Sequence, residues 1–446
     1  MGKVRYPDGH VLLRNLMRDF PVISHGEGVY LYDTDGKKYL DAAGGALVAS
    51  VGHGNKEVVA RISEQLGRVA YVNGTQFTSA VTEELATKLC SISPALGLNK
   101  ASFLCSGSEA VEAAIKFVRQ LWVERGQLKK AKMIARSPSY HGNTMLALSA
   151  SGRPHYKKYY GPLLTDVTVI PAPYGYRSTL KDYEKEGAEY YSHFLEEAIL
   201  KEGPENVAAF IVEPIIGSSA GGSLPPTGYF KRVQEICKRH NVMIIADEIM
   251  CGAGRTGKFF ASDHYGLKPD VLVLGKGISG GYIPVSALLT KDEYVQEMKK
   301  GTGYFMHAQT YMQAPSMTVA GVATLTYIEK HGLIQNCEKM GALLHKRLGE
   351  ELSSHPNVGC VAGKGLLVGV ELVESKATKK PFDRSKKAAE KLTTKAFENG
   401  LTLWPNVGQV DGVNGDLVVM GPPLAIRENE IEEIVRLLKK SVEETF

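Results

Sequence analysis

The chain has 446 residues, 43% of them apolar, and its 53 basic and 48 acidic side chains leave a formal charge of +5. This length predicts two domains, because a single hydrophobic core stops growing beyond about 250–300 residues. The small positive excess is spread along the chain, which argues against a nucleic-acid-binding surface.

The six cysteines are scattered without paired spacing. In a long chain this pattern favours a reducing compartment over a disulfide framework. The first 20 residues contain no apolar stretch typical of a signal peptide, and no apolar run approaches the roughly 18 residues that span a bilayer. We therefore expect a cytoplasmic enzyme without a membrane partner.

Short apolar runs alternate with helical stretches through the middle of the chain. In chain order, we expect strands at 28–33, 38–41, 101–105, 132–135, 207–212, 242–246 and 271–274, and helices at 109–126 and 229–239. Within the first helix, Val111, Ile115, Val118 and Trp122 fall on one face. This alternation predicts an α/β fold with a mostly parallel sheet and helices on both faces.

The pattern changes after His331. Helices are expected at 343–352, 386–399 and 428–444, and a strand at 365–372. This predicts a smaller α+β domain over residues 331–446, which the N-terminal segment 1–60 joins. Residues 61–330 then form the large domain.

Residues whose side chains could bind a ligand or take part in a reaction directly follow four of the expected strands. They are Ser106-Gly107-Ser108, Glu213, Asp247 and Lys276. Ligands bind outside the carboxyl ends of the strands in an open parallel α/β sheet. The sequence therefore predicts one ligand site that all four strand ends share.

Each of these groups has two interpretations. The turn from Ser106 to Ser108 offers free N–H groups to a phosphate at a helix N-terminus, but Ser106 with Glu109 also matches a capping box. A buried Asp247 needs a partner, either a protonated pyridine nitrogen or an ordinary cation. Lys276, between two glycines, is either a desolvated nucleophile toward an aldehyde or a surface charge. Tyr140 either stacks on a planar cofactor or packs in the core.

The glycines from Gly252 to Gly257 match the dinucleotide fingerprint G-x-G-x-x-G and nearly match a phosphate-binding P-loop. Phe259 stands where the P-loop requires Ser or Thr. Asp247-Glu248 separates the strand from the glycines, and no helix is expected after them. We therefore expect no dinucleotide binding here.

Taken together, these residues resemble the class III, or omega, aminotransferases of pyridoxal-phosphate (PLP) fold type I. The most specific stretch is 242–287, where the spacing of Asp247 and Lys276 fits the family. Further motifs follow in the expected order at 36–41, 106–110, 140–142, 213–214, 221–225 and 421–424. The resemblance covers nearly the whole chain and implies a large domain with a mostly parallel seven-stranded sheet and a smaller α+β domain.

The resemblance implies roles for individual residues. Lys276 would hold PLP as a Schiff base, and Asp247 would pair with its pyridine nitrogen; both are the catalytic candidates. The other implied cofactor contacts are Ser106, Gly107, Ser108, Tyr140, His141, Glu213, Ile249 and Thr310. Thr310 matches a threonine that reaches the phosphate from the neighbouring subunit, which implies a homodimer with shared active sites or a tetramer built from such dimers. No metal is implied.

The sequence departs from the family where donor specificity is set. Met250 replaces a glutamine, and Val419 replaces an arginine that grips a carboxylate in many relatives. Leu47 stands where several amine transaminases have tryptophan. With Phe20, Leu47 and Val419 are the predicted substrate-pocket residues. The departures resemble a subgroup that takes ω-amino acids, amines or aminosulfonates as donors, with pyruvate or 2-oxoglutarate as acceptor.

Three alternatives stay open at this point. An aminomutase, racemase or decarboxylase would use the same lysine and aspartate. An oxidoreductase would use a dinucleotide bound at the glycines 252–257. A binding protein without catalytic activity would have no need for this lysine and aspartate together.

Overall fold

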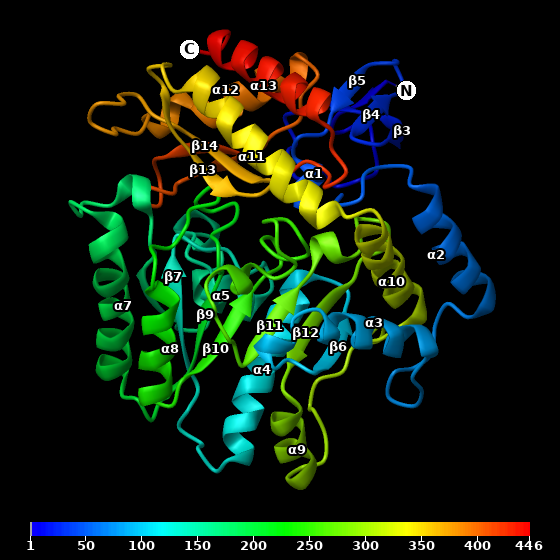
Figure 1. The fold of residues 1–446 in the computed structure, drawn as a ribbon, viewed down its shortest axis with the longest axis vertical. Helices are drawn as coiled ribbons and strands as arrows, with labels where there is room; N and C mark the ends of the chain where they lie inside the picture. Colours follow the sequence, from blue (N-terminus) through cyan, green and yellow to red (C-terminus); the bar gives the residue numbers. More distant parts are fainter. Residues whose placement is uncertain (1) are drawn as a thin grey trace.

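A seven-stranded sheet forms the centre of the computed structural model, which describes residues 2–446 (Figure 1). Across the sheet the strands are β6 (Lys100–Leu104), β12 (Ser286–Thr290), β11 (Val271–Leu274), β10 (Met243–Asp247), β9 (Val207–Val212), β7 (Lys132–Ser137) and β8 (Thr168–Pro171). Four neighbouring pairs, from β11 to β8, are parallel. The predicted α/β class with a mostly parallel seven-stranded sheet is confirmed.

Strand β12 runs antiparallel to both of its neighbours, β11 and β6. It lies outside the strands expected from sequence. Its register nevertheless aligns Ala287 with Leu274 and Ser286 with Leu104, at the ends of β11 and β6. One strand, β12, therefore lies between the strand that leads into α4 and the strand that leads to Lys276.

Helices cover both faces of the sheet. Val207, Phe210 and Val212 of β9 pack with side chains of α7 (Tyr183–Glu202) and α8 (Tyr229–Arg239). Ala208, Ala209 and Ile211 of the same strand pack with α4 (Gly107–Glu124) and α9 (Asp292–Lys300) on the opposite face. Because both faces are buried, β9 is apolar at every position, as is usual for a central parallel strand.

The helix α4 forms as its sequence predicts. Val111, Val118 and Trp122 are at most 1% exposed, and Ile115 is 8% exposed. The indole Nε1 of Trp122 donates a hydrogen bond to the carbonyl of Ala208 at 2.9 Å. Burial of one aromatic and three aliphatic side chains fixes α4 against the sheet, and each such side chain contributes about 1.5–3 kcal/mol. The start of α4 is thereby held at the carboxyl edge of the sheet.

A second, four-stranded antiparallel sheet lies in the C-terminal part of the chain. Its order is β13 (Val358–Lys364), β14 (Leu367–Leu372), β16 (Asp416–Met420) and β15 (Trp404–Val407). Three helices belong to this part: α11 (Leu333–Leu352), α12 (Ala388–Glu398) and α13 (Glu428–Glu443). The N-terminal sheet of β3 (Ile23–Glu27), β4 (Tyr30–Asp33) and β5 (Lys38–Leu40) lies beside it at the top of Figure 1.

Contacts across a long stretch of sequence connect the N-terminal strands to the C-terminal helices. The Leu40 N–H donates to the carbonyl of Gly400 at 2.8 Å. The hydroxyl of Tyr30 donates to Glu433 of α13 at 2.8 Å. These contacts support our proposal that residues 1–60 belong with the 331–446 domain, while residues 61–330 form the large domain.

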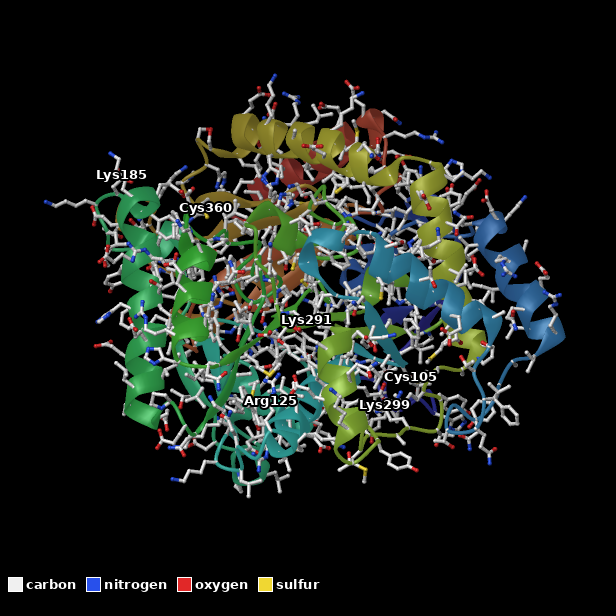
Figure 2. All side chains as sticks on the ribbon, turned by 60° about the horizontal axis from the view of Figure 1, so that its bottom comes forward. Cys105, Arg125, Lys185, Lys291, Lys299 and Cys360 are labelled. Atoms are coloured by element: carbon white, nitrogen blue, oxygen red, sulfur yellow. The ribbon has the colours of Figure 1, made fainter. Side chains whose placement is uncertain are left out.

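The other elements surround these sheets. They are β1 (Lys3–Val4), β2 (Phe20–Pro21), α1 (Gly44–Leu47), α2 (Lys56–Arg68), α3 (Ala80–Ser91), α5 (Met145–Ala150), α6 (Pro154–Lys157), α10 (Pro315–Lys330) and six short 3-10 turns. Charged side chains project outward from the helices, as Lys185 of α7 does in Figure 2. Among residues 2–446, no helix combines the length and apolarity needed to cross a membrane.

Candidate active site

A cavity of about 170 Å³, open in part to solvent, lies at the carboxyl edge of the large sheet. All four predicted strand ends contribute to it. Its lining is Ser106, Gly107, Ser108, Tyr140, His141, Gly142, Glu213, Ser218, Asp247, Ile249, Met250 and Lys276.

Lys276 follows β11 and begins a short 3-10 turn. Its backbone has φ 46°, a conformation that non-glycine residues adopt at a cost. Burial lowers the pKa of its ammonium to about 8, although the carboxylates of Asp247 and Glu213 act in the opposite direction. The amine is therefore partly neutral near neutral pH, which a nucleophile or a general base requires.

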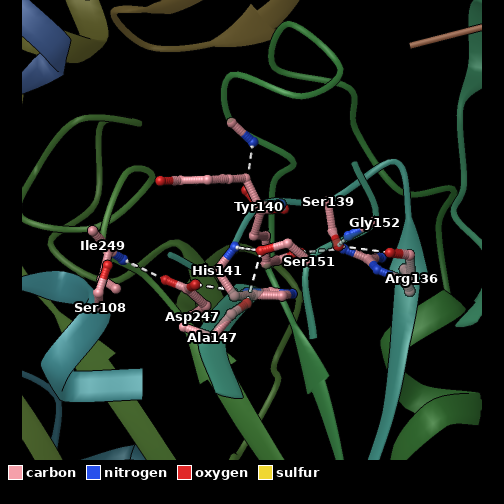
Figure 3. Close-up of polar contacts among 12 residues, drawn as sticks. Ser108, Arg136, Ser139, Tyr140, His141, Ala147, Ser151, Gly152, Asp247 and Ile249 are labelled. Carbon is pink, nitrogen blue, oxygen red and sulfur yellow. Dashed lines mark hydrogen bonds and ion pairs between the residues drawn. The ribbon is translucent and has the colours of Figure 1, made fainter. Parts of the chain in front are cut away.

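Asp247 ends β10 and is buried. Its Oδ2 lies 2.7 Å from Nδ1 of His141, and its Oδ1 accepts a hydrogen bond from the Ile249 N–H at 3.0 Å. Figure 3 shows Asp247 between these two partners. The structure thus gives the buried carboxylate a partner that the sequence analysis did not pair with it. The signal was the histidine of Tyr140-His141-Gly142.

A hydrogen bond also holds the backbone of His141 in place. The His141 N–H donates to Ser151 Oγ at 2.8 Å, which in turn donates to the carbonyl of Ala147 at 2.8 Å (Figure 3). His141 Nε2 is buried without a hydrogen-bond partner. The Nδ1 contact therefore fixes the ring toward Asp247, and His141 acts on the cavity through that carboxylate.

Glu213 follows β9 and connects two loops at the cavity. Its Oε2 accepts from the Tyr140 N–H at 3.2 Å, and its Oε1 accepts from the Gly217 N–H at 3.0 Å. Burial raises the pKa of this carboxyl, and the nearby Asp247 carboxylate acts in the same direction. Glu213 therefore fixes the backbone of Tyr140, whose ring forms one wall of the cavity.

The capping box at the start of α4 is present, and it is compatible with anion binding. Ser106 Oγ accepts from the Glu109 N–H at 3.3 Å, and Glu109 Oε2 accepts from the Ser106 N–H at 2.8 Å. The first N–H groups of a helix have no acceptor within the helix. Gly107 and Ser108 therefore present the positive end of α4 to the cavity that they line.

Two glycines at this end of the cavity have no room for a side chain. A Cβ on Gly107 would lie 2.9 Å from the side chain of Ile249. A Cβ on Gly142, where φ is 138°, would lie 2.6 Å from Ser108 Oγ. The glycines thus let the backbone of α4 approach both Ile249 and the loop that follows Tyr140.

Four predicted residues lie outside this cavity. Thr310 is exposed on the segment between α9 and α10. Phe20 lines a neighbouring groove. Leu47 and Val419 are buried in one apolar cluster against which Met250 packs, so they support the cavity wall from behind. Ser218, by contrast, lines the cavity and was not predicted, because no motif distinguishes it from other serines.

The glycines from Gly252 to Gly257 form turns without a following α-helix, and only a 3-10 turn at Ala261–His264 comes next. The buried Arg255 between them donates to the carbonyl of Pro422. Glu248, just before them, accepts from the N–H groups of Ala261 at 2.6 Å and Ser262 at 2.8 Å. This segment therefore lacks the helix N-terminus that binds a dinucleotide pyrophosphate.

Comparisons with known proteins agree with this geometry. The sequence model of the family "Aminotransferase class-III" matches residues 15–442. The uncharacterized aminotransferase YodT of Bacillus subtilis is 38% identical over 97% of each chain. The taurine–pyruvate aminotransferase of Bilophila wadsworthia is 35% identical over 94% of this chain and 92% of its own. An (S)-enantioselective omega-transaminase from Thermomicrobium roseum superposes with a TM-score of 0.91 at 33% identity, over 98% of this chain and 96% of its own.

Proposed function

Because the chain belongs to the class III aminotransferases, we propose that it moves an amino group from an ω-amino acid, an amine or an aminosulfonate to pyruvate, with 2-oxoglutarate as the alternative acceptor. Enzymes of this family depend on pyridoxal 5'-phosphate, so the chain is a PLP-dependent transferase. The observation that carries the proposal is the convergence of Lys276, Asp247, Glu213 and the start of α4 on one cavity.

The chemistry of the lining residues fits PLP. An amine with a lowered pKa, a buried carboxylate and a helix N-terminus line the same space. Lys276 Nζ would hold the cofactor covalently, and Asp247 would pair with its ring nitrogen. The N–H groups of Gly107 and Ser108, with the hydroxyls of Ser106 and Ser108, would hold its phosphate. Tyr140 and Ile249 would cover its ring.

When bound, PLP supplies an electron-withdrawing ring that stabilises negative charge at the carbon next to the substrate nitrogen. The chain supplies the proton transfers. Because its pKa is about 8, Lys276 Nζ is partly neutral. It can therefore act as a general base that takes the proton from that carbon, and then as the general acid that donates the proton to a different carbon. Asp247 would face the ring nitrogen, and His141, whose Nδ1 lies 2.7 Å from Asp247 Oδ2, holds the carboxylate in orientation.

Donor specificity rests on side chains that differ from the family pattern. Met250 forms part of the cavity wall, and Val419 offers an alkyl surface behind it instead of a cation. One relative is named a taurine–pyruvate aminotransferase, and taurine is an aminosulfonate. These observations support a donor that does not need a cation at position 419.

We also propose a homodimer with shared active sites, with a tetramer of such dimers as the larger assembly. Thr310 lies on an exposed segment that also carries the exposed side chains of Tyr304, Met306 and Tyr311. A monomer has little reason to expose three large apolar side chains on one segment, whereas a partner subunit would bury them. In the dimer, Thr310 would reach the phosphate in the partner's cavity. A cytoplasmic location accords with six cysteines that are all free thiols.

The test is amino transfer itself. Purified PLP-loaded protein is incubated with pyruvate and one donor from a panel of ω-amino acids, alkylamines and taurine, and alanine is quantified. Alanine formation that requires both substrates is the expected result. Conversion of a donor without any keto acid would instead assign an aminomutase, racemase or decarboxylase activity to the same site.

A further inference from the structure

A groove of about 870 Å³ lies beside the cavity and is open to solvent. Residues from the N-terminal segment, from α6 and from β15 line it. Arg153 lies at its boundary with the cavity: its guanidinium carbon lies 5.5 Å from the ring centre of Tyr140, which lines the cavity, and 4.6 Å from that of Tyr156, which lines the groove.

Arg153 differs from the other buried cations of this protein, Lys130, Arg136 and Arg255, because each of those donates to a backbone carbonyl. It is only 7% exposed. Its guanidinium lies against the ring of Tyr156, and among residues 2–446 no carboxylate lies within the 4.0 Å of an ion pair. Burial lowers the pKa of this arginine, and Tyr156, Tyr140 and the more distant Glu213 only offset that effect. A buried cation without a carboxylate is costly unless a ligand supplies the counter-charge.

The surroundings of Arg153 are also cationic. Arg14 and Arg18 line the same groove, and Arg14 donates to the hydroxyl of Tyr156 at 3.1 Å. Burial lowers the pKa of His155 to about 4, so this histidine is neutral. The one carboxylate in the lining, Glu390, pairs with Arg384. The groove therefore presents an excess of positive charge next to the cavity.

The arginine and the reactive lysine share one electrostatic environment. Burial is the main cause of the lowered pKa of Lys276, and the positive charge of Arg153 adds to it. A molecule whose amine enters the cavity and whose other end carries an anion would therefore contact both groups. The walls between the two ends, Tyr140 and Tyr156, are aromatic and suit a methylene chain.

We propose that Arg153 binds the carboxylate or sulfonate of the amino donor and makes this enzyme selective for anionic ω-amino donors over plain alkylamines. This inference rests on the proposed function and identifies its substrate class. The planar guanidinium matches a carboxylate or sulfonate through paired N–H donors. Binding at Arg153 would place the anion on the Tyr140 side of the cavity. The anion would then need no cation at position 419, which is valine.

The test compares two matched sets of molecules on the PLP-loaded enzyme. Each ω-amino acid of three to six carbons, and taurine, is paired with the alkylamine of the same chain length, and kcat/KM is measured with pyruvate. Binding of the corresponding carboxylates and sulfonates that lack the amine is measured by calorimetry. Arg153→Met removes the charge, Arg153→Lys keeps it without the planar fork, and Arg232→Met on the exposed face of α8 is the matched control.

Arg153→Met is expected to weaken binding of the amine-free anion roughly 10- to 150-fold, the effect of one lost charged hydrogen-bond partner. The ratio of kcat/KM for the anionic donor to that for its alkylamine should fall by a similar factor, mainly through KM. Arg153→Lys should fall between wild type and Arg153→Met, and Arg232→Met should match wild type. The intermediate Arg153→Lys keeps the test decisive if Arg153→Met does not fold.

Equal anion binding by wild type and both Arg153 variants would overturn the inference, as would a wild type that binds no amine-free anion. Failure of the proposed function would give a different experimental result. In that case the anions bind and the binding depends on Arg153, but no donor passes its amino group to a keto acid. A dependence limited to sulfonates or to carboxylates would identify which anion the site takes.

Discussion

Replacing Lys276 by methionine should stabilise the protein that carries no cofactor. The pKa of the Lys276 ammonium falls from 10.5 to about 8 because the side chain is buried. At 1.36 kcal/mol per pKa unit, the folded state loses about 3 kcal/mol at pH 7 by keeping this ammonium charged. Methionine has a similar shape and no charge, so Lys276→Met removes this cost at neutral pH.

The pH dependence identifies the origin of the gain. Below pH 8 the lysine is charged in both the folded and the unfolded chain, and the full cost is present. Between pH 8 and 10.5 the folded protein has released the proton while the unfolded chain still binds it, so wild-type stability rises with pH. The advantage of Lys276→Met should therefore shrink from about 3 kcal/mol at pH 7 to less than about 1 kcal/mol at pH 10.

The assay is urea unfolding of both proteins without cofactor, at equal protein concentration and at pH 7 and pH 10. Lys185→Met serves as the control, because Lys185 has an 84% exposed side chain and should show no pH-dependent difference. A Lys276→Met protein that is no more stable than wild type at pH 7 would refute the reasoning. So would a gain that stays constant from pH 7 to pH 10, since burial of a charge would then not be its cause.

Further predictions concern the other side chains of the cavity. Asp247→Asn should lower kcat about 10²–10³-fold while PLP still binds, because a neutral amide no longer favours the protonated ring; kinetics and visible absorption measure both, and unchanged kcat would contradict the assignment. Gly107→Ala should cost about 1–3 kcal/mol of stability and weaken PLP binding, because its Cβ would lie 2.9 Å from Ile249. Gly349→Ala is its control, since that Cβ meets open space in a helix, and a Gly107→Ala protein that unfolds at the same urea concentration would exclude the close contact. Thr310→Ala should raise the Kd for PLP in the dimer, whereas an unchanged Kd would remove this residue from the phosphate site.

The large sheet and the centre of the site could be predicted from the sequence. The parallel strands β9, β10 and β11 are short apolar runs, and a residue at or just beyond the end of each carries the chemistry, as with Asp247 at the end of β10 and Lys276 two residues beyond β11. A parallel sheet brings such ends to one edge, so local patterns were enough to gather these residues. The capping box at Ser106 was equally local.

Contacts between distant segments could not be predicted in this way. The pairing of His141 with Asp247 joins the loop after β7 to the last residue of β10, 106 positions away, and neither segment carries a pattern that predicts the other. Strand β12 has only three apolar residues between Ser286 and Thr290, and its place in the sheet is set by backbone pairing with β11 and β6, which are distant in sequence or run in the opposite direction. Arg153 appears in sequence as an ordinary basic residue, and only folding shows that it is buried over Tyr140 without a carboxylate partner.

The central claim is that Lys276 carries the cofactor of an aminotransferase, and a visible absorption spectrum tests it most directly. Wild-type protein supplied with PLP should be yellow, an ω-amino donor should bleach the band, and pyruvate should restore it. Lys276→Ala should bind PLP without being able to complete this cycle. A wild-type protein that shows no band after PLP is supplied, or a Lys276→Ala protein that cycles as wild type does, would contradict the account.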